Sequence, residues 1–330
     1  MLDMLAAETS FEGGHRLALA LEPSSDASQV TRRQALTGEA LRLDALGPPE
    51  LVSAADIRED VARAARSITL DPEVLFVVAL TLRAALEARR TLVTQREELP
   101  LLSARADAIS PGLDQLAVTI EQAVDAEGLR DGASPRLRSL RREQAVARER
   151  AAERLRELAS SLRAHLQEEF LTERSGRPVL AVRADARGAV PGIVHDASGS
   201  GQTIFVEPFA LVEQHNRLRE LVSEEREEIA RILTALSALL GASAADVTAA
   251  VDAIAELDLV LACARLAQRT AGCAVSQGED VVLVEGRHPL LDPRTAVAID
   301  LTLEGVRTLV ISGANAGGKT VALKMLGLAA

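Results

Sequence analysis

Apolar residues recur at every third or fourth position through most of the chain, which predicts a mainly helical protein. One predicted helix covers 73–99, with Asp71 as its N-cap and Pro72 at its first position. Residues 243–271 carry a second helical pattern. Two longer patterns, 134–172 and 208–240, keep an apolar stripe while charged residues fill the other faces. At about 1.5 Å per residue, these two segments predict helices of roughly 50–60 Å.

The segment between the two long patterns changes to a two-residue period that is typical of β-strands. Its apolar runs, 179–182, 192–194 and 203–206, are separated by glycine-containing turns. The economical interpretation is an antiparallel pair of helices that carries a small antiparallel sheet at its far end. Two ordinary surface helices remain the alternative.

Residues 313–320, Gly-Ala-Asn-Ala-Gly-Gly-Lys-Thr, have the spacing G-x-x-x-x-G-K-[ST] of a phosphate-binding loop. Residues 308–312 before the loop predict a strand and residues 321–328 after it predict a helix, which is the context that the motif needs. Backbone N–H groups and the helix N-terminus would then face phosphate oxygens. The motif predicts ATP binding, with Lys319 on the phosphates and Thr320 on Mg²⁺. The expected ATP-binding residues are Gly313, Asn315, Gly317, Gly318, Lys319 and Thr320.

Composition limits the class of partner. The formal charge is −11 over 330 residues, which disfavours a protein that coats nucleic acid along its whole surface. Five Phe and no Trp or Tyr disfavour binding by base stacking. Two cysteines fit a reducing cytoplasm. The sequence shows no leader and no long apolar run, so we expect a cytoplasmic protein without a membrane contact.

Arginines nevertheless concentrate on the predicted arm. Residues 134–187 contain 13 arginines against 8 acidic residues, a local excess of five positive charges. The arginines near position 140 fit two interpretations equally well: they belong to a solvent-exposed helix face, or they contact nucleic acid. For the four arginines nearest the β-rich segment we expect contacts with the phosphates of nucleic acid: Arg174, Arg177, Arg183 and Arg187.

Two other groups contain residue types that occur in functional sites. Phe205 and Glu207 lie two residues apart, but on a strand that leads into a helix we expect Phe205 to belong to the core. His195 and Asp196 stand near two serines, yet neighbouring strand residues point to opposite faces, so we expect no catalysis there.

Several stretches of this sequence resemble the bacterial MutS family, type two, the paralogue that lacks the mismatch-reading domain. The run 192–208, Gly-Ile-Val-His-Asp-Ala-Ser-Gly-Ser-Gly-Gln-Thr-Ile-Phe-Val-Glu-Pro, is similar to that family's arm-tip signature. The segments 286–291 and 298–300, followed by the phosphate-binding loop, look like the entry into its ATPase domain. Residues 16–23 and 39–43 fit its N-terminal core.

The resemblance implies a DNA-binding ATPase that acts as a homodimer. It also implies binding to double-stranded or branched DNA, suppression of homologous recombination, and in some members binding to ribosomal RNA and splitting of stalled ribosomes. A C-terminal Smr nuclease domain usually follows in that family. Because these residues contain no Walker B carboxylate, signature loop or Smr domain, we expect nucleic-acid binding without ATP turnover.

The expected fold class is mainly α: a helical core, a long antiparallel lever arm, a small β-rich clamp at its tip, and the start of an α/β ATPase domain of the ABC type. The expected domains are a helical core at 1–133, an ascending lever helix at 134–172, a clamp at 173–208, a returning helix and core at 209–272, and the ATPase segment at 273–330. Two alternatives are a non-catalytic coiled-coil scaffold for interaction or dimerisation, and a coiled-coil ATPase of the SMC or RecN type. In the latter the phosphate-binding loop precedes the coil, whereas here it follows.

Overall fold

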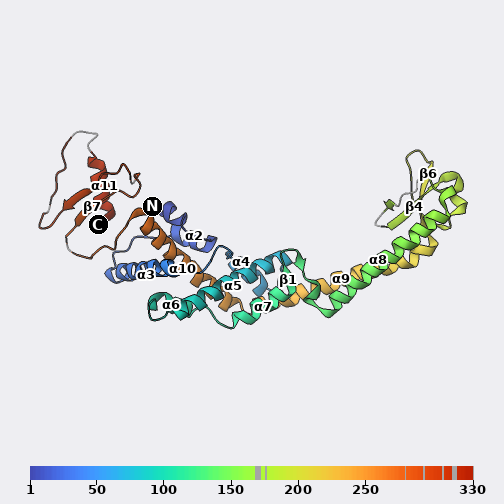
Figure 1. Cartoon of the computed structure of the whole chain (residues 1–330), viewed down its shortest axis with the longest axis horizontal. Helices are drawn as coiled ribbons and strands as arrows, with labels where there is room; N and C mark the ends of the chain where they lie inside the picture. Colours follow the sequence, from blue (N-terminus) through green and yellow to red (C-terminus); the bar gives the residue numbers. More distant parts are fainter. Residues whose placement is uncertain are drawn as a thin grey trace. The chain divides into compact units, whose positions relative to one another are not determined.

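A computed structural model describes residues 1–167, 172–174, 177–278, 280–292, 294–306, 308–313 and 318–329 of the chain (Figure 1). Its secondary structure is mainly helical, as the sequence predicts. The α-helices are α1 Leu2–Ala6, α2 Glu12–Leu19, α3 Ala27–Leu46, α4 Arg58–Ala65, α5 Pro72–Thr94, α6 Pro100–Ala106, α7 Leu113–Ala123, α8 Pro135–Ser161, α9 Phe209–Ala242, α10 Ala244–Thr270 and α11 Lys319–Ala329. Short 3-10 helices are η1 Asp131–Ala133, η2 Arg163–His165 and η3 Ala184–Ala189. The strands are β1 Val124–Asp125, β2 Gly128–Leu129, β3 Thr172–Arg174, β4 Arg177–Arg183, β5 Gly192–Ala197, β6 Thr203–Pro208, β7 Val282–Gly286 and β8 Ile299–Thr302.

The chain folds into two compact units, which are described separately. The first comprises Met1–Ala62, Val77–Ala117 and Ala242–Ala330, and the second comprises Arg63–Phe76 and Val118–Gly241. Among the described residues, no helix is both long enough and apolar enough to cross a membrane.

Helix α10 is the centre of the first unit. It packs against α1, α2, α3 and α6. A helix with neighbours on several sides must be apolar around most of its circumference. Alanines and branched residues accordingly alternate along α10, and Val251, Ile254 and Leu261 are fully or almost fully buried.

Two buried carboxylates in this unit bind the starts of other helices. Asp258 on α10 accepts hydrogen bonds from the backbone N–H of Ser10 (2.9 Å) and Phe11 (3.3 Å), just before α2. Glu39 on α3 accepts from the backbone N–H of Leu101 (3.1 Å) and Leu102 (2.8 Å), at the start of α6. The first N–H groups of a helix lack partners within it, so each carboxylate satisfies donors that would otherwise be buried unpaired.

The last part of the first unit consists of β7, β8 and α11. The two strands pair antiparallel, and Met325 of α11 packs against Gly286 of β7. Helix α11 confirms the helix predicted after the glycine loop. The strand predicted at 308–312 is wrong: those residues form no strand, and Leu309, Val310 and Ile311 are exposed. An apolar run becomes a strand only where another strand supplies ladder hydrogen bonds, and β7 and β8 pair with each other.

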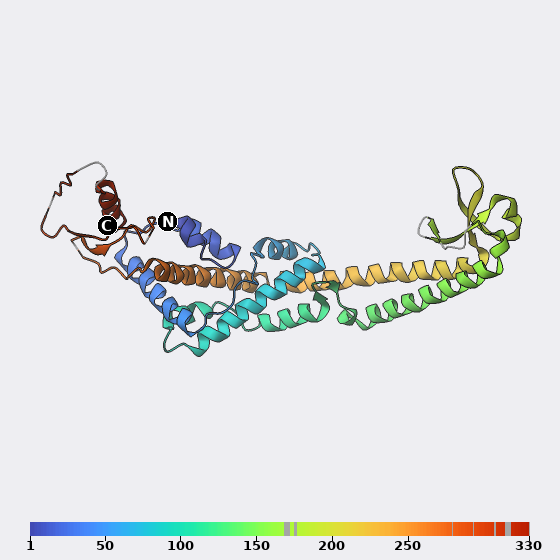
Figure 2. The same ribbon diagram turned by 45° about the horizontal axis from the view of Figure 1, so that its top comes forward.

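In the second unit, α8 and α9 run antiparallel and side by side, which both views show (Figures 1 and 2). Polar contacts fix their register near the start of α8. Ser134 donates to Glu228 Oε1 (2.7 Å), and Arg141 Nε donates to Glu225 Oε1 (2.9 Å). Gln144 donates to the backbone oxygen of Leu221 (3.1 Å). At the other end, Leu155 of α8 and Leu211 of α9 belong to one buried cluster. The predicted antiparallel helix pair is therefore present.

Helix α8 is shorter than the sequence predicts. A continuous helix was expected to residue 172, but α8 ends at Ser161. Beyond it, Leu166 forms a β-bridge with Val182, and Gln167 N–H donates to the backbone oxygen of Ala181 (2.9 Å). The apolar periodicity of the helix continues into this segment because Leu166 is buried against the sheet, so the pattern alone could not show where the helix ends. Helix α5 likewise ends at Thr94, short of the predicted residue 99.

The predicted sheet between the two helices is present and has four antiparallel strands in the order β3-β4-β6-β5. Alternate residues of β4 and β6 point to one face, where Leu180, Val182, Ile204 and Val206 form a core with Leu155 of α8 and further apolar residues. Phe205 was expected in this core but lies outside it, half-buried on the opposite face, because it stands between Ile204 and Val206 on the strand. The guanidinium of Arg174 lies over its ring, 4.0 Å from the centroid.

Candidate functional site: a glycine loop and an arginine-bearing sheet

Both described ends of the glycine loop have a glycine with positive φ. Gly313 has φ +146° and Gly318 has φ +79°, conformations that residues with a Cβ rarely adopt. Asn315 and Gly317, two of the predicted phosphate-binding residues, lie outside the described residues. Lys319 is the first residue of α11 and Thr320 the second, so both stand at the positive end of an eleven-residue helix.

The side chain of Lys319 bends back over the loop. Its Nζ donates to the backbone oxygen of Gly313, six residues earlier. The ammonium therefore lies close to both ends of the glycine loop, where a phosphate would sit against the helix N-terminus. Two glycines with positive φ, a lysine at the loop and a hydroxyl beside it fit a nucleotide phosphate with its Mg²⁺. Among the described residues, no group of three His, Cys, Asp or Glu side chains is placed to hold a metal by itself.

The four arginines predicted to contact nucleic acid lie at different places around the sheet. Arg183, at the end of β4, forms a two-pronged ion pair with Asp185 (2.7 and 3.0 Å) and is about half exposed. Arg187 is exposed on η3. Arg174, on β3, is held over Phe205 and lies 3.5 Å from a carboxylate oxygen of Asp196. Arg187 thus presents its charge to solvent, Arg183 is exposed but shares its charge with Asp185, and Arg174 is partly engaged within the sheet.

Arg177 has a structural role instead. Its side chain is 16% exposed, and its Nη1 donates to both oxygens of Glu207 (2.7 and 2.8 Å). Its Nη2 donates to Asn216 Oδ1 (3.2 Å) on α9. A guanidinium held by a fully buried carboxylate is poorly available to a phosphate. The contact with nucleic acid stays a prediction, but Arg177 is the weakest of the four candidates.

Glu207 connects the sheet to helix α9 through three basic side chains. Its carboxylate is fully buried at the end of β6, and besides Arg177 it accepts from His195 Nε2 (2.7 Å) and His215 Nδ1 (2.8 Å). His195 comes from β5, Arg177 from β4 and His215 from α9. The four residues are called the Glu207 cluster below. Each oxygen of the carboxylate therefore accepts from Arg177 and from one histidine, and a buried carboxylate requires such partners.

A β-bulge explains how His195 reaches this position. Val194 pairs with Val206 and Asp196 pairs with Phe205, so His195 is the extra residue in β5. A bulge re-aims the side chain that it carries. The sequence argument assumed that neighbouring residues of this strand point strictly to opposite faces. The bulge breaks that alternation at His195. The bulge gives His195 a structural partner in Glu207. The absence of catalysis at His195 and Asp196 stays a prediction.

Hydrogen bonds determine the direction in which the pKa of Glu207 is shifted. Burial by itself would raise the pKa of Glu207, but hydrogen bonds from His215, His195 and Arg177 outweigh it and hold the pKa below its ordinary value. Nε2 of His215 is buried without a hydrogen-bond partner among the described residues. The hydrogen bond to the carboxylate requires a proton on Nδ1 of His215, because a carboxylate oxygen can only accept.

Sequence reasoning missed the Glu207 cluster because its members are separated by up to 38 residues. The available signal was weak. It consists of a glutamate near the end of a predicted strand and a histidine eight residues later on a predicted helix. Only the strand order and the bulge bring the four side chains together.

Comparison with known proteins identifies the relatives of this fold. The chain is 40% identical over 335 residues to a protein named Endonuclease MutS2 from Pelotomaculum thermopropionicum, covering 99% of this chain and 42% of that protein. It is also 40% identical over 346 residues to an Endonuclease MutS2 of Thermomicrobium roseum, covering 99% and 44%. The chain belongs to the MutS2 family.

The family assignment confirms the resemblance that the arm-tip run and the glycine loop indicated. A further MutS2-named relative, from Symbiobacterium thermophilum, is 40% identical over 334 residues. This MutS2-family chain spans less than half the length of the relatives it matches. A search against protein-family models found no match.

Proposed function

We propose that this chain is the nucleic-acid-contacting arm of a MutS2-type ATPase, in which α8 and α9 form a lever and the four-stranded sheet with η3 forms a clamp. The observation that carries the proposal is the pair of exposed guanidinium groups beside the sheet, in a chain of this family. Arg183 and Arg187 are exposed there, although the whole chain is strongly acidic. Phosphates of a duplex are the ligand that this local charge favours.

The glycine loop would supply the nucleotide dependence. Lys319 would bind the phosphates, backbone N–H groups of the loop would surround them, and Thr320 would hold Mg²⁺. A bound Mg²⁺–ATP supplies a phosphoanhydride bond whose hydrolysis also requires a carboxylate to position water. We propose that the glycine loop binds Mg²⁺–ATP and that the protein works as a homodimer.

The test is the salt dependence of duplex binding. Electrophoretic shifts with linear and branched DNA are measured over a range of salt concentration for the native chain and for Arg187→Ala. Each phosphate contact contributes about 0.9 to the slope of log affinity against log salt. We expect Arg187→Ala to lower the slope by about one and to weaken linear and branched DNA alike, because phosphate contacts carry no sequence information.

Arg183→Glu has a matched control in the other unit. Arg294 forms the same two-pronged ion pair with a carboxylate two residues away, Asp292. We expect Arg183→Glu to weaken DNA binding by about tenfold or more and Arg294→Glu to change it much less. Equal losses in the two variants would mean that only net charge matters, and the clamp assignment would be wrong. Arg177 is unsuited to this test, because its loss would disturb the Glu207 cluster.

The same surface could accept ribosomal RNA, since both polymers present phosphates. Repeating the titration with a ribosomal RNA fragment separates the two targets: tighter binding to branched DNA at equal salt supports a role in recombination, and tighter binding to RNA supports a ribosomal role.

A further inference from the structure

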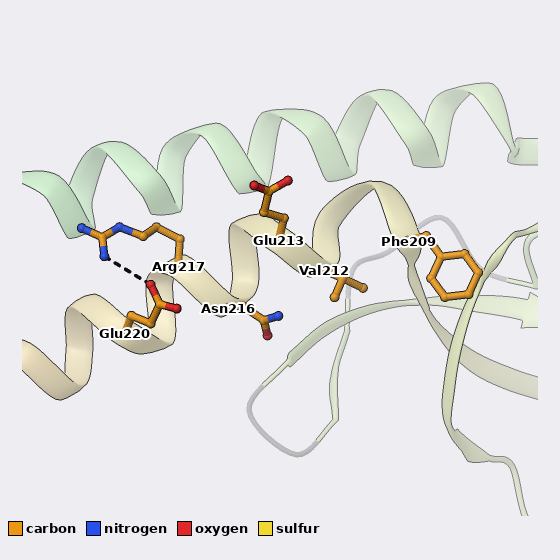
Figure 3. Close-up of a pocket in the computed structure, with 6 residues that line it drawn as sticks. All are labelled: Phe209, Val212, Glu213, Asn216, Arg217 and Glu220. Atoms are coloured by element: carbon orange, nitrogen blue, oxygen red, sulfur yellow. Dashed lines mark hydrogen bonds and ion pairs between the residues drawn. The ribbon is translucent and has the colours of Figure 1, made fainter.

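A shallow groove runs along the outward face of the first turns of α9. Its volume is about 630 Å³, and it is lined by Phe209, Val212, Glu213, Asn216, Arg217 and Glu220. Figure 3 shows Glu213 and Arg217 on the edge nearer α8, with Val212 and Asn216 on the opposite edge. From Phe209 to Glu220 the groove follows twelve residues of helix, whose ends are roughly 17 Å apart.

The exposed aromatic ring is the first observation that points to a partner. The chain has five phenylalanines, and Phe209 is 62% exposed at the start of α9. Its backbone N–H is already bonded to the oxygen of Pro191, so the helix start does not require this side chain. A large apolar ring on a groove is typical of an anchoring position for another molecule.

The charges that line the groove select the partner. Glu213 and Glu220 are exposed carboxylates on the same face as Phe209. The cation on the groove, Arg217, is already shared among carboxylates: Glu220 at 3.2 Å, Glu224 at 3.3 Å and Glu143 at 3.6 Å. A phosphate placed here would face these carboxylates and would have to displace them from Arg217, which disfavours nucleic acid.

We propose that this groove docks a basic segment of a partner protein, with an arginine or lysine of that segment over the Phe209 ring. Phe209 and Glu213 are four residues apart on the helix, so a bound segment can contact the ring with one side chain and the carboxylate with another. Glu220, seven residues further, is shared with Arg217 at 3.2 Å and would bind a second cation in exchange for that arginine. Apolar side chains of the segment can cover Val212. The groove lining does not include Arg183 or Arg187, although Asn216 in that lining accepts a hydrogen bond from Arg177.

The experiment measures fluorescence anisotropy of labelled peptides with the full chain. The probe is a short peptide of alternating arginine and leucine, and its matched partner has glutamate in place of arginine. We expect the arginine peptide to bind and the glutamate peptide not to bind. We expect Phe209→Ala, and separately Glu213→Gln with Glu220→Gln, to weaken the arginine peptide by about tenfold.

Two control variants separate this groove from general attraction to an acidic protein. Leu46→Ala removes an apolar side chain that is 56% exposed on α3, and Glu50→Gln with Glu97→Gln removes two exposed charges elsewhere. Both should leave peptide affinity within about twofold. Equal weakening by the charge control, or no effect of Phe209→Ala, would overturn the proposal. Loss of DNA binding in Phe209→Ala with unchanged peptide binding would assign the groove to nucleic acid instead.

Discussion

Glu207 shows how one buried carboxylate can join several elements of a small sheet and a helix. It accepts from one arginine and two histidines that lie on three different elements. A buried charge is tolerated only when hydrogen bonds and ion pairs with its partners compensate for the free energy that desolvation costs. The same pattern recurs at Asp258 and Glu39, each of which accepts backbone N–H groups at the start of a helix.

At this scale, Glu207→Gln is expected to destabilise the second unit by about 3 kcal/mol, because it leaves Arg177 with an uncompensated buried charge. Urea denaturation of native and variant chains measures the change. Asp292→Asn serves as a control, since its ion pair with Arg294 is exposed and its loss should matter much less. A loss no larger than that of the control would contradict a structural role for the cluster.

Among the elements, α8 and α9 depend on different contacts along their length. Near the start of α8 the two helices are joined by polar side chains, chiefly Ser134, Arg141 and Gln144 with glutamates of α9. At the other end, Leu155 and Leu211 join the core of the sheet. The polar end is therefore sensitive to pH and the apolar end to packing.

Glu228 gives that pH sensitivity a direction. Hydrogen bonds from Arg231 and Ser134 lower its pKa from 4.5 to about 2. The unfolded chain therefore takes up the proton first as pH falls, so the stabilisation by Glu228 is complete above pH 4.5 and is lost towards pH 2. We expect the stability difference between the native chain and Glu228→Gln to shrink over this interval, measured by denaturant midpoints at several pH values. Glu227→Gln, an exposed neighbour, should show no such change.

Close approach of helices predicts a second effect. A Cβ added at Gly241 of α9 would lie 2.6 Å from the backbone oxygen of Ala64, which cannot move as a flexible side chain could. Gly241→Ala should cost about 1–3 kcal/mol of unfolding free energy. Gly38→Ala, in the interior of α3 with open space around it, should instead gain about 0.5–1 kcal/mol. Thermal denaturation of both variants tests the pair, and a stabilising Gly241→Ala would refute the close contact.

Over the whole molecule, exposed apolar side chains are unevenly distributed. Half of the large apolar residues exposed in the described structure, twelve of 24, lie between Val275 and Leu328. The same stretch holds the glycine loop and the unpaired run 308–312. Few buried contacts predict low local stability there, whereas α10 is buried along most of its length.

Hydrogen exchange can test this difference together with nucleotide binding. We expect amides of α10 to exchange slowly and those of 308–312 to exchange fast. Mg²⁺–ATP should slow amide exchange at the start of α11 in the native chain, because a ligand stabilises the folded state to which it binds. In Lys319→Ala the exchange rates should be the same with and without Mg²⁺–ATP. Equal slowing in both proteins would show that the glycine loop is not the nucleotide site.

The amino-acid sequence by itself determined the helical class, the helix pair, the β-rich segment between the two helices and the family. These follow from periodicity and from short motifs, which local chain geometry fixes. The ends of α8 and α5 and the missing strand at 308–312 depended on the tertiary structure, because a helix can be ended by a competing β-bridge and a strand needs a partner. The Glu207 cluster also depended on the tertiary structure, because strand order and a bulge at His195 bring together four residues that no sequence spacing relates. In this cluster Arg177 is paired with Glu207 and is largely buried.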